Sequence, residues 1–276
     1  MNQNKRENYD NMKHIRLLLG ILILIGAFNW LMYPMIYSNK NTFCLYDGKG
    51  TIEDPFIIDS NDKLIALRDS VNAGENYYGY YFLQTADIDL TGVEWIPIGI
   101  FGDNHYFKGV YNGNGHCISH LTCHDEKSNN GLFGLLNGTV MNLCVRDSSL
   151  SGRYVGTITS HGTEGALILN CYASGNISAT GRAGGICDNL GRGQIVNCAF
   201  CGVLDAPTIG GITSYSSRII MHSSSNIEPY NNNCSGRIVD CLKINQETDA
   251  KKFLNDGISI LSKEEIVQTV DLTVWE

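Results

Sequence analysis

Apolar positions in the second half of the chain recur with a nearly constant period. The repeats begin with the segments GLFG (131–134), VGTI (155–158), GGIC (184–187) and GGIT (210–213). Their alignment sets four aliphatic anchors 26, 28 and 26 residues apart, at Leu132, Ile158, Ile186 and Ile212. An asparagine follows the first three anchors after 10 to 12 residues, at Asn142, Asn170 and Asn197. Self-similarity at such a period is typical of stacked units that bury their apolar faces against one another.

Each repeat contains two or three short runs of β-forming residues, such as 166–169 and 194–196, separated by clusters of Gly, Asn and Ser. A unit of this length holds three short strands with their turns. The repeats therefore predict an all-β fold, a parallel β-helix or solenoid whose coils stack about 4.8 Å apart. We expect the anchors Ile158, Ile186 and Ile212 to form an aliphatic column in the core, and the glycines to occupy tight corners.

A differently built region precedes the repeats. Residues 48–58 (GKGTIEDPFII) combine turn residues with a short apolar strand. Ser60 or Asn61 can begin a helix that runs to about Asn72, and its apolar face consists of Leu64, Leu67 and Val71. We expect this helix to cap the open end of the solenoid, where strand edges and core side chains need cover.

The amino-terminal region carries an apolar stretch long enough to cross a bilayer. Residues 17–37 hold no charge over 21 positions, and the basic side chains that flank them lie mainly in 1–16. The positive-inside rule then predicts a single-pass membrane protein with a cytoplasmic amino terminus and an extracellular carboxy-terminal domain. A cleavable signal peptide is the alternative, but bulky residues, Trp30 to Tyr33, occupy the zone where small residues would mark cleavage, which favours an uncleaved anchor.

The net charge of the part predicted to be exported limits the kinds of partner that it could bind. Removing the two acidic and four basic residues of 1–16 from the totals of 28 and 20 leaves 26 against 16, a net charge of −10 for the exported part. Such an acidic surface argues against nucleic acid as a partner. Zincin, serine hydrolase, P-loop and dinucleotide motifs are absent from the sequence, and nothing in it calls for a cofactor.

The chain has ten cysteines, an even number that is compatible with disulfides outside the cell. Two of them occupy equivalent places in successive repeats, Cys171 and Cys198. At those places they would stack in an interior ladder, where a thiol behaves as a small buried hydrophobe. Stacking alone does not decide whether two thiols meet disulfide geometry, so the disulfide and the free-thiol states both stay open.

An ordered set of motifs resembles the GLUG-motif proteins of bacterial cell surfaces. The motifs are GxGTxxDPF at 48–56, YYGYYFLQTADIDL at 77–90, WIPIG at 95–99, FKGVYNGNGHCISHL at 107–121 and the coils that start at 131. This resemblance implies a right-handed parallel β-helix exposed outside the cell. Such motifs also occur as accessory modules in streptococcal immunoglobulin A peptidases, whose zinc chemistry resides in another domain. The ending TVDLTVWE is similar to the close of such modules, so we expect the chain to end there.

These features predict a division of the chain into six parts. They are a cytoplasmic tail (1–16), a transmembrane signal anchor (17–37), a linker (38–47), the cap with the first coils (48–130), GLUG-type repeat coils (131–227) and a carboxy-terminal cap (228–276).

An enzyme on this scaffold would need convergent carboxylates. The available acids are Asp87, Asp89, Glu94 and Asp103, of which Asp87 and Asp89 lie two apart on a predicted strand and so share a face. Acids that bound a strand more often make turn hydrogen bonds, and DIDL matches the structural pattern of the family, so we interpret both as structural rather than catalytic.

A metal site is a further hypothesis, raised by the segment HCISHLTCH. In an extended strand its histidines, His116, His120 and His124, are spaced about 13 Å apart, too far for two of them to bind one zinc ion. We therefore predict no metal site.

Binding is the favoured class of function. Tyrosines along the coils can stack on sugars or pack on a protein, and the candidates are Tyr106, Tyr111, Tyr154 and Tyr172. The hypothesis is a membrane-anchored, non-catalytic surface module for adhesion or for recognition of an extracellular glycan or protein. The alternatives are a carbohydrate-active enzyme, either a polysaccharide lyase or a glycosidase, and a structural part of an envelope assembly.

Overall fold

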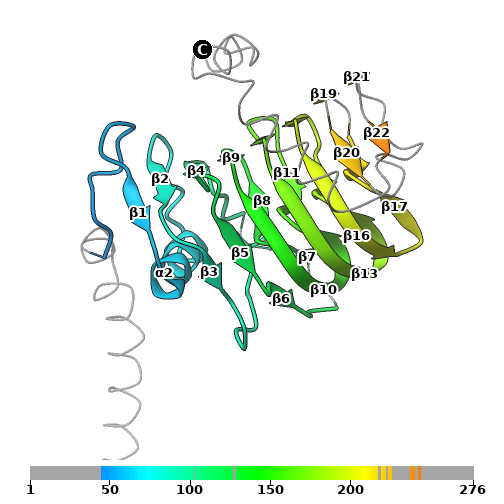
Figure 1. Cartoon of the computed structure of the whole chain (residues 1–276), viewed down its shortest axis with the longest axis horizontal. Helices are drawn as coiled ribbons and strands as arrows, with labels where there is room; N and C mark the ends of the chain where they lie inside the picture. Colours follow the sequence, from blue (N-terminus) through cyan, green and yellow to red (C-terminus); the bar gives the residue numbers. More distant parts are fainter. Residues whose placement is uncertain are drawn as a thin grey trace, which may run out of the picture. The chain divides into compact units, whose positions relative to one another are not determined.

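The computed structural model describes residues 45–102, 104–126, 129–216, 219–221, 223–225, 237–239 and 242–243. These residues form a parallel β-solenoid with three sheets (Figure 1). In each sheet the neighbouring strands run parallel. The predicted parallel β-solenoid is thereby confirmed.

Sheet A contains one short strand from each coil. Its order is β1 (Phe56–Ile58), β2 (Tyr81–Gln84), β4 (Val110–Asn112), β9 (Thr139–Met141), β12 (Leu167–Leu169), β15 (Gln194–Val196), β19 (Ile219–Met221) and β21 (Arg237–Val239). Spatial order follows sequence order along this sheet, because each coil adds one strand on top of the one before.

Sheets B and C complete the coils. Sheet B comprises β3 (Ile88–Asp89), β5 (Cys117–Ser119), β6 (Thr122–Cys123), β7 (Asn129–Asn130), β10 (Cys144–Gly156), β13 (Tyr172–Gly184), β16 (Ala199–Asp205), β17 (Thr208–Gly210), β20 (Ser224–Ser225) and β22 (Leu242–Lys243). Sheet C comprises β8 (Phe133–Leu136), β11 (Thr159–Gly162), β14 (Cys187–Asn189) and β18 (Thr213–Tyr215).

The core is a column of side chains that runs from coil to coil. Ile158 donates its backbone N–H to Ile186 at 2.9 Å, and Ile186 donates to Ile212 at 3.0 Å, so the predicted anchors are confirmed as neighbours. All three are fully buried. In the earlier coils the column is aromatic, since the rings of Phe82 and Phe107 lie 5.9 Å apart and those of Phe107 and Phe133 5.3 Å. Apolar burial along this axis is the main force that holds the coils together.

Glycines and asparagines shape two different corners. Gly156, Gly184 and Gly210 stand in register, and a Cβ added at Gly184 would lie 1.8 Å from the carbonyl oxygen of Cys187. The close approach of backbones requires glycine there, as predicted. The other corner uses asparagines in the left-handed region, with φ of 52°, 54° and 51° at Asn142, Asn170 and Asn197.

These asparagines also bond to one another across the coils. The amide Nδ2 of Asn142 donates to Asn112 at 3.0 Å, that of Asn170 to Asn142 at 2.8 Å, and that of Asn197 to Asn170 at 2.8 Å. The result is a ladder in which the side-chain amide of one asparagine per coil donates a hydrogen bond to the asparagine of the coil before it. The sequence signal of a recurring asparagine therefore has two physical causes, the left-handed backbone and the stacked amides.

A helix covers the first end of the solenoid. The helix α2 (Asn61–Asn72) follows β1, and its buried apolar side chains are Leu64, Leu67 and Val71, as predicted. Its ends are fixed to the next coil, because Asn61 donates to the carbonyl of Asp89 at 2.6 Å and Asn72 bonds both Pro97 and Gly99. Asp89 belongs to β3, the edge strand of sheet B, so α2 covers that edge (Figure 1).

The predicted membrane span, 17–37, lies outside the described residues, as do the tail and most of the linker and the carboxy-terminal cap. Within the part of the chain that the structure describes, no helix combines the length and the apolar character needed to cross a bilayer.

Candidate functional site

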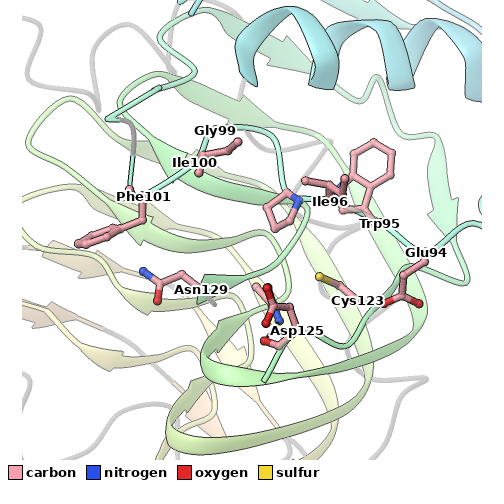
Figure 2. A pocket seen from close by; sticks show the side chains of 12 residues that line it. Glu94, Trp95, Ile96, Gly99, Ile100, Phe101, Cys123, Asp125 and Asn129 are labelled. Atoms are coloured by element: carbon pink, nitrogen blue, oxygen red, sulfur yellow. Dashed lines mark hydrogen bonds between the residues drawn. The ribbon is translucent and has the colours of Figure 1, made fainter. Parts of the chain in front are cut away.

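A pocket of about 500 Å³ opens on the surface of the early coils (Figure 2). The segment 94–102 forms one side of it, and Cys123, Asp125, Asn129 and Asn130 form the other. Its volume falls within the range of small-molecule sites in proteins, roughly 300–1,000 Å³.

The segment 94–102 is held in place by its buried residues. Trp95 is buried and donates its ring N–H to the carbonyl of Leu132 at 3.0 Å, while Arg68 of α2 lies over the ring at 5.1 Å. Ile98 bonds backbone to backbone with Leu132 and Gly134. With these inner residues fixed, the outer residues of the segment face the pocket from a rigid support.

The opposite side is fixed by Asn130. Its amide Nδ2 donates to the carbonyls of Asp125 at 2.8 Å and Ser151 at 2.5 Å, and the side chain is buried. The Oδ1 atom of Asn130 has no hydrogen-bond partner among the described residues. A buried amide that ties two segments together orders this side of the pocket before any ligand arrives.

The lining combines exposed apolar surface with polar groups. Ile96 and Phe101 are 54% and 56% exposed, unusual values for such large side chains, while Glu94, Asp125 and Asn129 supply carboxylates and an amide. Figure 2 shows Phe101 and Asn129 at one end of the pocket and Glu94 with Cys123 at the other. An apolar ring beside a few planar polar groups is an arrangement that suits a ligand with both a hydrophobic face and hydroxyls.

Cys123 is a buried thiol in the lining of this pocket. Burial, together with the charges of Glu94 and Asp125, raises the pKa of its thiol to about 12. At neutral pH Cys123 is therefore a thiol, which is a poor nucleophile and a poor metal ligand.

A row of side chains continues from the pocket along the coils. Asn129, Tyr154 and Arg182 are neighbours in register on β7, β10 and β13. The guanidinium of Arg182 lies 4.6 Å from the centre of the Tyr154 ring and makes two hydrogen bonds to the carboxylate of buried Asp188, at 3.0 and 3.1 Å. Ser214 also donates to this carboxylate. Arg182 and Asp188 thus fix the Tyr154 ring next to the pocket.

His161 contacts Phe101, one of the residues that line the pocket. Its ring centre lies 5.6 Å from that of Phe101, in an edge-to-face arrangement. Burial lowers the pKa of His161, so its imidazole is neutral at physiological pH and packs as a polar aromatic ring.

Three histidines on the outer face of sheet B each meet a carboxylate of the preceding coil. The Nδ1 atoms of His116, His120 and His124 lie 3.2, 2.8 and 3.4 Å from carboxylate oxygens, in the pairs His116 with Asp87, His120 with Asp89 and His124 with Glu94. The spacing of these histidines along their own strand does not reveal the pairing. The signal was an offset of about one coil between acids and histidines, 29 residues for the first pair.

Asp87 and Asp89, the weak catalytic candidates, both support the fold. Asp87 accepts the backbone N–H of Cys117 at 2.9 Å, and that bond, with His116, lowers its pKa. Asp89 accepts from the hydroxyl and backbone N–H of Thr91 and from His120, which lowers its pKa to about 2. Both acids are ionised at neutral pH, and neither is suited to donate a proton as a general acid.

The four candidate tyrosines separate into two groups. Tyr106 and Tyr154 are partly exposed. Tyr111 and Tyr172 are buried, with 0% and 2% of their surface exposed, so the prediction that they offer rings to a ligand is wrong. Tyr111 points into the core and donates its hydroxyl to Gln84 at 2.9 Å, and burial raises its pKa.

Among the described residues, no group of three or more His, Cys, Asp or Glu is arranged to hold a metal ion. The fourth acid considered above, Asp103, lies outside them. The sequence did not indicate Phe101, Asp125 and Asn129 as site residues, because they carry no recognisable motif. Phe101 and Asp125 come from loops, and Asn129 begins the two-residue strand β7.

Comparison with known proteins places the chain among parallel β-solenoids. No protein-family model matches it, so the likeness to GLUG-motif proteins stays a resemblance. A crystal structure from Bacteroides ovatus, described as a "putative immunoglobulin A1 protease", superposes with a TM-score of 0.50 at 21% identity and covers 72% of this chain and 80% of that one. At this identity the likeness concerns the fold alone.

Part of this chain is similar in sequence to part of a much larger protein. Halomucin of Haloquadratum walsbyi is 34% identical over 154 residues, which is 51% of this chain. The chain spans about 2% of the length of halomucin, so it resembles one small part of that protein.

Proposed function

We propose that this chain is a right-handed β-solenoid module, anchored at the cell membrane by residues 17–37, that binds an extracellular glycan in the pocket beside Phe101 and does not transform it. The observation that carries the proposal is the exposed Phe101 ring next to a carboxylate, Asp125, and an amide, Asn129. Similarity to a protein named halomucin supports a role at the cell surface.

The chemistry of sugars explains why this lining fits. A pyranose ring has an apolar face of C–H groups, which stacks on an aromatic ring, and a rim of hydroxyls, which bond to carboxylates and amides. Phe101 and Ile96 supply the first kind of contact, and Asp125 and Asn129 the second. Tyr154, fixed by Arg182 in the adjoining row, extends the surface for a second sugar unit.

A glycan array with the detergent-solubilised full-length chain tests the proposal. Phe101→Ala is expected to remove most of the binding, while Val203→Ala, a change at a 59% exposed apolar residue on β16, leaves it intact. Equal binding by wild type and Phe101→Ala, or no binding to any glycan, would speak against the proposal.

A carbohydrate-active enzyme is the second candidate, favoured by one observation. Glu94 and Asp125 both line the pocket, and paired carboxylates are what a glycosidase needs. Glu94, however, is already bonded to His124, through the backbone N–H at 2.7 Å and the ring at 3.4 Å. Reducing-sugar release from the bound glycan, absent in Asp125→Asn but present in wild type, would establish the enzyme instead.

A further inference from the structure

An exposed guanidinium lies one coil beyond the pocket. Arg153 and Tyr154 are consecutive residues of β10, and Tyr154 is the register partner of Asn129, which lines the pocket. Neighbouring strands of a sheet are about 4.8 Å apart, so the backbone of Tyr154 lies one strand spacing from the pocket. The guanidinium of Arg153 lies over the Tyr154 ring, 5.0 Å from its centre.

The Tyr154 ring is a fixed support for this guanidinium. The ring packs over the backbone of Gly181, where an added Cβ would lie 2.8 Å from the Cε1 atom of the ring. The guanidinium of Arg182 lies 4.6 Å from the ring centre and is itself held by two hydrogen bonds to buried Asp188. A ring held in this way orders the cation that stacks on it before any ligand arrives.

The two guanidinium groups differ in the charge that they leave available. Arg182 is paired with Asp188, whose hydrogen bonds raise the pKa of Arg182, so the pair has no net charge. Arg153 is exposed and makes no ion pair with a carboxylate of the described residues. An arginine keeps its charge at any physiological pH. The positive charge of Arg153 is therefore available to an anionic group of a ligand.

The carboxylates of the pocket and this cation belong to successive coils. Glu94 forms a bridge to the coil that carries Asp125 and Asn129, and that coil pairs with β10, which carries Arg153. Figure 2 shows Glu94 at the end of the pocket opposite to Asn129. A ligand that extends from the pocket past Asn129 therefore meets hydrogen-bond acceptors first and a cation afterwards.

Contacts between side chains link the exposed Phe101 ring to the Tyr154 ring. His161 lies against Phe101, with 5.6 Å between the ring centres. Burial lowers the pKa of His161, and the charges of Asp188, which raises it, and of Arg182, which lowers it, also act on this group. His161 is thus close to Arg182, which contacts the Tyr154 ring. One ligand can lie along both rings.

We propose that the glycan bound beside Phe101 carries an acidic sugar, a uronic acid, next to the sugar in the pocket, and that Arg153 binds the carboxylate of this acidic sugar. The inference rests on the function proposed above and names the class of glycan. A planar guanidinium donates two parallel N–H groups to a carboxylate, which gives direction as well as affinity. A neutral sugar in the same place leaves the charge of Arg153 unpaired.

Uronic-acid oligosaccharides and their carboxyl-reduced forms, bound to the detergent-solubilised full-length chain, test the proposal. The reduced forms keep the rings and hydroxyls, and a CH₂OH group replaces each carboxylate. We expect the acid form to bind about tenfold more tightly, and this ratio of affinities to fall as the salt concentration rises. Arg153→Gln should bring the ratio to about one, because glutamine still donates a hydrogen bond but has no charge. Arg192→Gln removes an exposed guanidinium that pairs with Glu164, and it should keep the wild-type ratio.

The outcomes separate this inference from the proposed function. Binding that depends on Phe101 but is equally tight for the acid and carboxyl-reduced forms would overturn the role of Arg153 and leave the proposed function standing. A preference for the acid form that Arg153→Gln does not change would also overturn the role of Arg153. Failure to bind any glycan would overturn both the proposed function and this inference.

Discussion

Replacing Asn170 with Ala tests the asparagine ladder, the most regular device in this solenoid. Asn170 donates to Asn142 and accepts from Asn197, both at 2.8 Å, and its backbone has a φ of 54°. Alanine removes both hydrogen bonds and keeps a side chain in the left-handed region. Two separate costs should therefore appear in the free energy of unfolding.

The size of each cost follows from the surroundings. Asn197 is buried, so its unpaired amide costs about 1–3 kcal/mol, while Asn142 is only half-buried and water can replace part of its bond. The left-handed backbone adds about 1 kcal/mol for alanine and almost nothing for glycine. We expect a loss of about 3 kcal/mol for Asn170→Ala and about 2 kcal/mol for Asn170→Gly.

Urea unfolding of the detergent-solubilised chain, followed by far-ultraviolet circular dichroism, measures both variants. The midpoint should fall by roughly 1 M for Asn170→Ala, given a slope of about 3 kcal/mol/M. The matched control is Asn176→Ala, an exposed asparagine on the strand that follows, which should change stability by less than about 0.5 kcal/mol. A midpoint for Asn170→Ala equal to that of the control would show that the asparagine ladder does not stabilise the fold.

Three further predictions concern other features of the fold. Asp89 has a pKa of about 2 in the folded chain against an ordinary value of 3.8, so it stabilises the protein above about pH 4 and loses this effect as the pH falls toward 2. The difference in free energy of unfolding between wild type and Asp89→Asn, measured with urea at each pH, should therefore shrink over that range. A difference that stays constant would disprove this role of Asp89. Gly184→Ala should destabilise the chain by more than about 2 kcal/mol, since its Cβ would meet the Cys187 carbonyl, whereas Gly102→Ala, with open space around it, should not. Burial raises the pKa of Cys198, so iodoacetamide at pH near 8 should label it only after unfolding, and rapid labelling of the folded chain would contradict its burial.

The stacking of the coils could be predicted because it depends on a repeated local pattern. Leu132, Ile158, Ile186 and Ile212 recur at nearly equal steps, and the structure buries all four. The helix α2 was predicted from its apolar spacing in the same way. Each of these patterns involves residues that lie close together in the sequence, so the buried positions can be predicted from the period alone.

The tyrosines show where this reasoning fails. Tyr111 lies in the short strand β4, and Tyr172 is the first residue of β13, directly after a corner. In both places the face that a side chain takes depends on where the corner falls, and a shift of one residue exchanges the two faces. Tyr172 packs against Ala199 and Cys144 on a face that single-strand alternation does not identify as buried. Predicting its burial would have required the register of three adjacent coils.

The histidine pairs and the pocket depend on neighbours in other coils. His116 meets Asp87 across 29 residues, a contact that the spacing of histidines along one strand does not reveal. The pocket is set by the path of 94–102, where Trp95 is held by Leu132 of a later coil and Phe101 is left exposed. Loops carry such sites without periodic sequence signals, so the sequence alone did not indicate them.

Hydrogen exchange in the presence of the glycan selected on the array would test the proposed function most directly. We expect slower exchange on binding for amides of 94–102 and of Asp125, Asn129 and Asn130, the segments that line the pocket. Amides of β16, on the exposed surface around Val203, should be unchanged. Protection confined to β16, or no protection around the pocket at saturating glycan, would contradict the proposal that this chain recognises its ligand beside Phe101.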